Sequence, residues 1–330
     1  MKVRVITKAD IQANLAMSEV IPMVKKAYRA LATQQVIMPP RLQIPVEEKE
    51  GVTLFMPAYL KQENALGSKI VSVFPHNAQF KRPTINAVFF LISSETGVPL
   101  ALMEASWLTA LRTGAASGVA TEYLARTEAK IAAIFGAGVQ GRTQLLAVSH
   151  VQPLTKVWVY DPNREAARNF VEEMKTWGSS VPSEILVASS PQEAIKEADI
   201  ICTATTATRP VFNGADVKPG THINAIGSFT PEMQELPEDI ITKAKIVVDS
   251  RPACLEEAGD IIIPWRQGLI TPQDIYGEIG EIVLGSLPGR VDDEEITVFK
   301  SVGLAIQDVI VAQLILEKAQ QHNFGQEVEL

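Results

Sequence analysis

One segment restricts the possible folds of this chain more than any other: IAAIFGAGVQGRTQLLAV, residues 131–148. An apolar run leads directly into Gly136, Gly138 and Gly141, and helix-forming residues follow. In a G-x-G-x-x-G turn between a strand and a helix, the glycines allow a tight turn, a close approach of a pyrophosphate, and close packing of helix on strand. The N–H groups at the helix start attract the phosphate charge. We therefore predict a dinucleotide site that includes Val139 and Gln140.

Residues beyond this turn indicate which dinucleotide is bound. Asp161 ends the next apolar run, VWVYD. An acidic residue about 20 positions after the third glycine accepts hydrogen bonds from the ribose hydroxyls, which favours NAD(H). Arg164 can instead meet a 2′-phosphate, so NADP(H) stays an alternative. Thr203 and Thr205, in the loop CTATTAT, are either contacts to the ribose or nicotinamide or ordinary polar loop residues.

The region from about residue 126 to 300 repeats the strand–helix pattern. We expect strands at residues 131–135, 157–160, 185–187, 200–203, 222–226 and 246–248, with helices or loops between them. This alternation is typical of an α/β fold, a doubly wound parallel sheet of the Rossmann type.

The two ends of the chain have different patterns. Apolar residues recur at helical spacing after Ser18, which is a candidate N-cap. Alternating segments bounded by Gly, Pro and Asn then predict an antiparallel sheet with a hairpin at residues 95–97. A last helix contains Asp308 as the only charge between Lys300 and Glu317, so it should be buried against another domain or another subunit.

Composition excludes several classes of protein. The 330 residues suggest two domains, and the net charge of −8 with scattered Lys and Arg argues against nucleic acid or an anionic membrane as a partner. No apolar run approaches the roughly 18 residues of a membrane span, and the first residues do not resemble a signal peptide, so we expect a cytoplasmic protein. The two cysteines and four histidines lack the spacing of a metal site, and we expect no bound metal and no disulfide.

A lone arginine points to a second site. Arg112 is the only charged residue between Ala105 and Thr121, in a stretch of small residues where an unpaired charge would cost several kcal/mol. Asp308 could lie nearby and accept hydrogen bonds. Taken alone, Arg41 and Lys69 are ordinary surface charges, but together with Arg112 they would form a positive pocket. We infer that this pocket binds a substrate carboxylate, which an arginine can hold through two parallel N–H bonds.

Motifs along almost the whole chain resemble the ornithine cyclodeaminase and mu-crystallin family. They are PPR (39–41), MPAY (56–59), GSK (67–69), RPT (82–84), LRTGAASGVAT (111–121), FGAGVQGRTQ (135–144), INAIG (223–227), GEIGEIVLGSLPGR (277–290) and KSVGLAIQD (300–308). The resemblance implies an NAD(P)-binding Rossmann domain at residues 123–300 and an α+β domain, residues 1–122 and 301–330, for substrate binding and homodimerisation. It also implies that Arg41, Lys69 and Arg112 are carboxylate-binding and acid/base positions, that Thr84 contacts substrate, and that Thr113 contacts the cofactor.

One departure from the family pattern affects the expected reaction. After INAIG, the family's cyclodeaminases have an aspartate that handles the substrate amine, whereas Phe229 stands at that place here. A phenyl ring cannot take a proton, so ornithine cyclisation is disfavoured. By resemblance we expect a reductase of small cyclic ketimine carboxylates, with Lys69 as the acid/base group. The alternatives are an amino-acid dehydrogenase of the alanine dehydrogenase type, an ornithine cyclodeaminase, and a non-catalytic protein that binds NAD(P)H and a small ligand.

Overall fold

The computed structural model describes residues 1–178 and 180–330, except for the side chain of Ala78, and the chain forms two compact units. The first unit consists of residues 1–112 and 304–330, and the second of residues 113–303. Helix α3, Ala105–Leu124, contributes residues to both. None of the described helices is long and apolar enough to cross a membrane.

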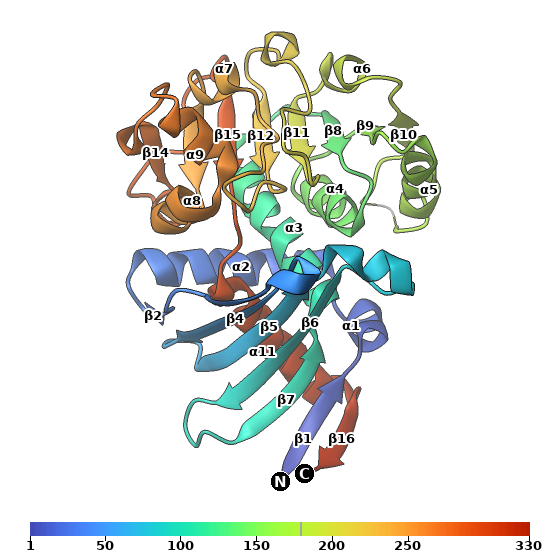
Figure 1. Cartoon of the computed structure of the whole chain (residues 1–330), viewed down its shortest axis with the longest axis vertical. Helices are drawn as coiled ribbons and strands as arrows, with labels where there is room; N and C mark the ends of the chain where they lie inside the picture. Colours follow the sequence, from blue (N-terminus) through green and yellow to red (C-terminus); the bar gives the residue numbers. More distant parts are fainter. Residues whose placement is uncertain (179) are drawn as a thin grey trace. The chain divides into compact units, whose positions relative to one another are not determined.

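The second unit is built on a parallel sheet. Its eight strands within the described residues follow the order β10-β9-β8-β11-β12-β15-β13-β14. Figure 1 labels all of them except β13. They are β8 Ile131–Phe135, β9 Lys156–Tyr160, β10 Glu184–Val187, β11 Ile200–Thr203, β12 His222–Ala225, β13 Lys245–Val248, β14 Ile275–Glu278 and β15 Thr297–Lys300. The chain runs from β8 to β9 and β10 on one side and then to β11 and β12 on the other. The strand order therefore reverses beside β8, the point at which such sheets bind ligands.

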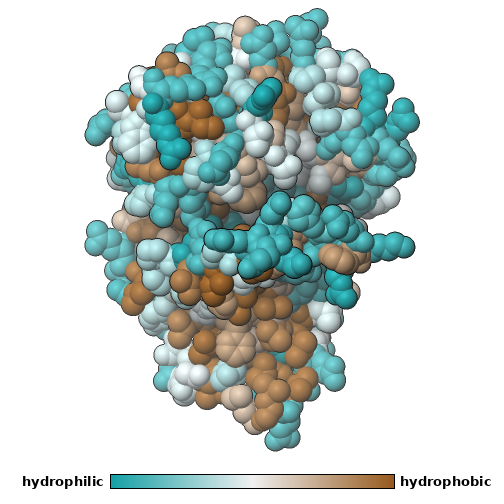
Figure 2. Space-filling view, in the orientation of Figure 1, coloured by the Kyte–Doolittle hydropathy of each residue, from teal (hydrophilic) through white to brown (hydrophobic). Residues whose placement is uncertain are grey.

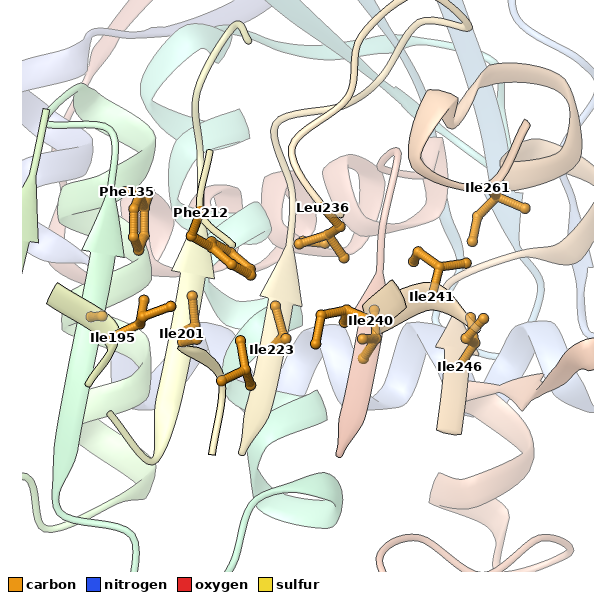
Figure 3. Close-up of a cluster of buried hydrophobic side chains, with 14 of the residues drawn as sticks. Phe135, Ile195, Ile201, Phe212, Ile223, Leu236, Ile240, Ile241, Ile246 and Ile261 are labelled. Carbon is orange, nitrogen blue, oxygen red and sulfur yellow. The ribbon is translucent and has the colours of Figure 1, made fainter. Parts of the chain in front are cut away.

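Helices cover both faces of this sheet. They are α4 Val139–Val151, α5 Arg164–Met174, α6 Pro191–Ile195, α7 Glu238–Ile241, α8 Arg251–Glu257, α9 Gly259–Arg266 and α10 Ile279–Leu284, with short 3-10 turns η3 Gly214–Asp216 and η4 Pro272–Asp274. Alternate residues of β8 enter two separate cores, because side chains alternate across a strand. Phe135 belongs to the core drawn in Figure 3, and Ile134 packs in the other core with Leu145 of α4 and Phe170 of α5. The predicted doubly wound α/β fold is confirmed.

The first unit contains a mainly antiparallel sheet. Its strands follow the order β16-β1-β7-β6-β5-β4-β2, β3 also pairs with β4, and the parallel pair is β1 with β7. They are β1 Lys2–Ile6, β2 Val36–Ile37, β3 Leu42–Val46, β4 Gly51–Leu60, β5 Ala65–Val73, β6 Ile85–Ser93, β7 Pro99–Glu104 and β16 Gln326–Glu329. The predicted hairpin joins β6 to β7, where Gly97 has a φ of 72°. The two ends of the chain pair through β1 and β16 (Figure 1).

The remaining elements of this unit are α1 Lys8–Asn14, α2 Met17–Ala32, α11 Ala305–His322, η1 Glu47–Lys49 and η2 Pro75–Phe80. Two sequence-based expectations need correction. Helix α2 begins after Ala16 rather than Ser18, because the Glu19 carboxylate accepts from the Ala16 backbone N–H at 3.0 Å. Helix α11 packs on β4, β5, β6 and α2, so its apolar surface is buried by its own unit and needs no other domain or subunit.

Candidate functional site

The glycine turn lies between β8 and α4, and its three glycines have different surroundings. Gly136 has a φ of 98°, which glycine adopts without strain, and a Cβ there would lie 2.5 Å from the Ala204 carbonyl oxygen. A Cβ on Gly141 would overlap the Gly136 carbonyl oxygen. A Cβ on Gly138 would meet nothing within 4 Å. The outer glycines therefore serve the packing of the turn, whereas Gly138 leaves its backbone open to a ligand.

The start of α4 offers unsatisfied groups. Gly138 is the N-cap and has no side chain to accept from the first N–H groups of the helix, which have no partners within it. Val139, the first helical residue, is 49% exposed. Gln140 Oε1 is buried without a hydrogen-bond partner in the described part of the chain. An anion would satisfy the helix N–H groups, and a ligand hydroxyl would satisfy the Gln140 oxygen.

A cleft of about 580 Å³ lies at the carboxyl ends of β8, β9 and β11. It is lined by the glycine turn, by Asp161 and by residues 204–207 and 209–211. Asp161 Oδ2 accepts from the Ala137 N–H at 2.9 Å and Oδ1 accepts from the Asn163 N–H at 2.8 Å. A carboxylate has about four lone-pair sites, so Asp161 can still accept from ribose hydroxyls. Arg164, the first residue of α5, is exposed.

The two predicted threonines share a buried carboxylate that the sequence analysis did not identify. Thr203 Oγ1 donates to Glu235 Oε2 at 2.7 Å, and Thr205 Oγ1 donates to Oε1 at 2.8 Å. The backbone N–H groups of Thr205 and Gly227 donate to the same carboxylate, at 2.6 and 2.7 Å. Glu235 thus joins the loops after β11 and β12. Thr205 lines the cleft, whereas Thr203 is fully buried.

Charged residues also surround Glu235. The backbone N–H groups of Glu235 and Leu236 donate to Asp260 Oδ1 at 2.7 and 2.9 Å, and Lys300 Nζ lies 3.1 Å from Asp260 Oδ2. Burial and the neighbouring Asp260 carboxylate raise the pKa of Glu235 above its usual value, although Lys300 opposes this. The loops at the carboxyl edge of the sheet therefore rest on a fully buried polar network.

A second cluster of charges lies in the first unit. Lys69 Nζ is 2.8 Å from Asp308 Oδ2, and Arg112 Nε donates to Asp308 Oδ1 at 2.9 Å. All three are buried: Lys69 is 2% exposed, Arg112 5% and Asp308 0%. The sequence left open whether Asp308 lies near Arg112. It does, so Arg112 has a protein carboxylate as a partner, contrary to the inference that a substrate carboxylate alone fills this role. Two cations share one carboxylate, so the cluster has a net charge of +1.

Helix α11 holds the Arg112 guanidinium at a second point. Arg112 Nη1 donates to Gln307 Oε1 at 2.7 Å, and Gln307 Nε2 donates to the Tyr28 hydroxyl at 2.6 Å. Gln307 Oε1 also accepts from the Leu304 N–H at 3.1 Å, at the start of the helix. Two consecutive residues in the first turn of α11 therefore orient this arginine.

The electrostatic surroundings of Lys69 change its acidity. Burial lowers the pKa of Lys69 to about 8, with further lowering from the Arg112 and Arg41 guanidiniums, while Asp308 opposes the shift. Burial alone would raise the pKa of Asp308, but Arg112 and Lys69 outweigh it and hold that pKa below its usual value. Lys69 is thus an ammonium group that can release its proton close to neutral pH.

The other predicted residues occupy varied positions. Arg41 is partly buried just before β3, and Thr84 is exposed in the turn before β6. Thr113 is buried in α3, and its carbonyl accepts from Gln144 Nε2 at 3.3 Å. Phe229 is 40% exposed in the loop after β12.

Together these observations fit a bound dinucleotide in the second unit. Gly138 provides open space at a helix start, Gln140 provides a buried acceptor without a partner, and Asp161 can accept from hydroxyls at the edge of the same cleft. A pyrophosphate and a ribose supply the groups that such a site lacks.

Comparison with known proteins agrees with this architecture. The family model described as ornithine cyclodeaminase/mu-crystallin matches residues 1–323. A delta(1)-pyrroline-2-carboxylate reductase of Bacillus cereus is 42% identical over 326 residues, covering 98% of this chain and 99% of the relative. The structure of delta(1)-pyrroline-2-carboxylate reductase from Thermococcus litoralis, in complex with NADH and L-proline, has a TM-score of 0.95 at 45% identity and covers 99% of this chain and 100% of that one. An archaeal alanine dehydrogenase dimer with bound NAD has a TM-score of 0.93 at 37% identity, and the match covers all of both chains. The chain belongs to the ornithine cyclodeaminase/mu-crystallin family.

Proposed function

We propose that this chain is an NAD(P)H-dependent reductase of small cyclic ketimine carboxylates, which converts 1-pyrroline-2-carboxylate to proline or 1-piperideine-2-carboxylate to pipecolate. The observation that carries the proposal is the buried cluster of Lys69, Arg112 and Asp308 with its net positive charge. An uncompensated buried charge costs several kcal/mol, and a substrate carboxylate would supply the missing negative charge. The pyrroline-2-carboxylate reductases that resemble this chain, one of them with L-proline bound, support a cyclic substrate.

The residues of the cluster have different roles in the proposed reaction. A reduced nicotinamide, when bound, would supply a hydride for the C=N carbon beside the carboxylate. Arg112 and Arg41 hold the carboxylate, which restricts the orientation of that carbon. Lys69, whose pKa is about 8, is protonated at neutral pH and gives its proton to the imine nitrogen. One hydride and one proton thus convert the imine to the amine.

Two further residues stay predictions as substrate contacts. Thr84 is a candidate hydrogen-bond partner, and Phe229 presents an apolar ring. Because a phenyl ring cannot accept a proton from a substrate amine, Phe229 supports reduction of an imine rather than loss of ammonia from ornithine.

The proposed cofactor site consists of the glycine turn, the start of α4 and the edges of the cleft. Solved relatives contain NADH or NAD, which supports NAD(H) as the cofactor. Asp161 would accept from the ribose hydroxyls, and the exposed Arg164 is the residue through which NADPH could still bind. Thr113, Thr203 and Thr205 complete the proposed contacts, with Thr203 acting through Glu235.

The archaeal alanine dehydrogenase favours one alternative, the reduction of pyruvate in the presence of ammonia. Both activities need the same hydride donor and a carboxylate clamp, so a substrate assay separates them. One assay follows the loss of NADH absorbance with 1-pyrroline-2-carboxylate, with 1-piperideine-2-carboxylate, and with pyruvate plus ammonium. A second assay incubates the protein with ornithine and NAD+ and measures the release of ammonia. We expect turnover of a cyclic ketimine. Activity only with pyruvate would replace the proposal by the alternative, and ammonia from ornithine would refute the argument from Phe229.

We also propose a homodimer formed through the sheet of the first unit. The register places Leu42, Phe55, Ile70 and Val88 in one row across β3–β6, on the face opposite Lys69. Leu42 is 60% exposed and Val88 41%, and apolar side chains gather over this sheet in Figure 2. A face of this kind fits a second copy of the chain.

The dimer is tested by sedimentation velocity on the Val88→Glu variant, which should be monomeric. Val291→Glu is the matched control, because Val291 is 69% exposed in a loop of the second unit and its substitution should leave the dimer intact. A monomeric wild-type protein would refute this proposal. A cytoplasmic location stays a prediction from the sequence.

A further inference from the structure

We propose that Asp308 is a positioning residue of the reductase, which holds the Lys69 ammonium as the acid and the Arg112 guanidinium as the carboxylate clamp through its two oxygens. The inference rests on the proposed function and adds to it a residue that touches neither substrate nor cofactor. Each oxygen faces one cation, at 2.8 Å for Lys69 and 2.9 Å for Arg112.

The surroundings of Asp308 leave it little freedom to move. It is fully buried in the first turn of α11, and the preceding residue, Gln307, holds the other side of the Arg112 guanidinium. Helix α11 in turn packs against β4, β5 and β6. The separation of the ammonium and the guanidinium is therefore set by a helix lying on the sheet that carries Lys69.

Among the groups around Lys69, Asp308 is the one that stabilises its protonated form. On the adjoining strands, Met56 and Phe89 are paired with Lys69 in the register, and both are buried and apolar. The Arg112 and Arg41 guanidiniums disfavour a third positive charge, whereas the Asp308 carboxylate favours it. Without this carboxylate, an ammonium influenced by two guanidiniums would lose its proton at lower pH.

The variant that tests this role is Asp308→Asn, which removes the charge and retains the shape. The pH profile of kcat/KM with 1-pyrroline-2-carboxylate should lose activity as pH rises through the pKa of Lys69, because only the protonated form donates. This fall of activity at high pH is the alkaline limb of the profile. In Asp308→Asn the alkaline limb should move to lower pH by roughly one to three pH units. Asp308→Glu keeps the charge, so its limb should stay near the wild-type position while KM rises through the altered geometry.

A matched control separates positioning from loss of stability. Asp199 is a carboxylate that accepts from four donors, on Arg126, Lys218 and the backbone N–H groups of Lys130 and Ile131. It lies in the second unit, just before β11, and has no contact with Lys69 or Arg112 among the described interactions. Asp199→Asn should lower the free energy of unfolding without moving the alkaline limb. A limb that stays in place in folded Asp308→Asn would overturn the proposal. If Asp308→Asn does not fold, an unchanged KM in Asp308→Glu would overturn it.

A measurement independent of turnover keeps this inference apart from the proposed function. The 13Cε resonance of Lys69, assigned by its absence in Lys69→Met, reports the ionisation of the ammonium directly. A lower pKa of Lys69 in Asp308→Asn than in wild type would support the role of Asp308 even if no ketimine were reduced. Ketimine turnover with the same pKa in both proteins would leave the proposed function intact and refute the inference.

Discussion

Glu235→Gln is the substitution whose consequences can be worked out most fully. Each oxygen of Glu235 accepts from one backbone N–H and one hydroxyl: Oε1 from the two donors of Thr205, and Oε2 from Gly227 N and Thr203 Oγ1. A glutamine has one carbonyl oxygen, so its NH2 group must replace one of these two acceptors. The hydroxyl on that side can turn and accept, but the backbone N–H cannot. Either orientation of the amide therefore leaves one N–H without its acceptor, the buried N–H of Gly227 or the partly buried N–H of Thr205.

The cost follows from these four bonds. An unsatisfied buried donor costs about 1–3 kcal/mol, and the two bonds that remain each lose about 1 kcal/mol because the acceptor is no longer charged. Removal of a buried negative charge beside Asp260 offsets part of this loss. We expect the free energy of unfolding to fall by about 2–4 kcal/mol. The melting temperature should fall by roughly 5–15 °C.

The same change should weaken NADH binding, because Glu235 joins the loops after β11 and β12 and residues 204–207 line the cleft. Titration of NADH fluorescence measures the dissociation constant. A loss of about 1.4 kcal/mol corresponds to a tenfold rise in Kd, which we take as the smallest expected effect.

Asp199→Asn is the control for this experiment too, since it removes a well-bonded carboxylate from the other end of the sheet. It should lower stability and leave the Kd for NADH unchanged. If Glu235→Gln loses stability and yet binds NADH as tightly as Asp199→Asn, the loops do not depend on Glu235 for their binding geometry, and the reasoning fails.

Three further predictions concern the proposed site. Gly138→Ala should keep the melting temperature and weaken NADH binding, whereas Gly141→Ala should lose at least about 1–3 kcal/mol of stability, because only the second added Cβ meets backbone. Wild-type kcat/KM should fall as pH rises through about 8, the pKa of Lys69, and Lys69→Met should lose roughly 10²–10⁴-fold in kcat. Asp161→Asn should reduce the preference for NADH over NADPH, measured as a ratio of kcat/KM values.

For each of these predictions, one experimental outcome would contradict the reasoning. Equal stability of the two glycine variants would contradict the assignment of Gly141 to packing and Gly138 to ligand approach. A pH profile that rises through about 8 would make Lys69 a base rather than an acid in the forward reaction. An unchanged cofactor ratio in Asp161→Asn would mean that the ribose hydroxyls are bound elsewhere.

The sequence predicted the parallel sheet where the pattern was local and strong. The six expected strands exist, because each is a short apolar run between helices or turns. Strands β14 and β15 were missed. Gly277 and Glu278 interrupt the apolar pattern of β14. Strand β15 follows four consecutive acidic residues, 292–295, a composition typical of a solvated turn. Their pairing with β13 is a long-range contact, and no local pattern encodes it.

The glycine turn could be predicted from the sequence and Glu235 could not, for a physical reason. The glycine turn is recognisable because its spacing directly encodes a backbone shape. Glu235 was missed because it lies among other acidic residues in PEMQELPED, where nothing distinguishes it from a solvated side chain. Its role depends on Thr205 and Gly227, which approach it only when β11 and β12 pair.

Arg112 and Asp308 were easier to single out from the sequence than Glu235 and harder to interpret than the glycine turn. Arg112 and Asp308 each stand alone in an apolar stretch, and burial of either without a partner would cost several kcal/mol. Sequence reasoning left the contact between these two charges open, and the structure shows them as a 2.9 Å ion pair. One carboxylate cannot neutralise two buried cations, however, and Lys69 takes its other oxygen at 2.8 Å. The net positive charge of this cluster, counted over the part of the chain that the structure describes, is what argues for an anionic ligand, and it does so more strongly than the lone arginine did.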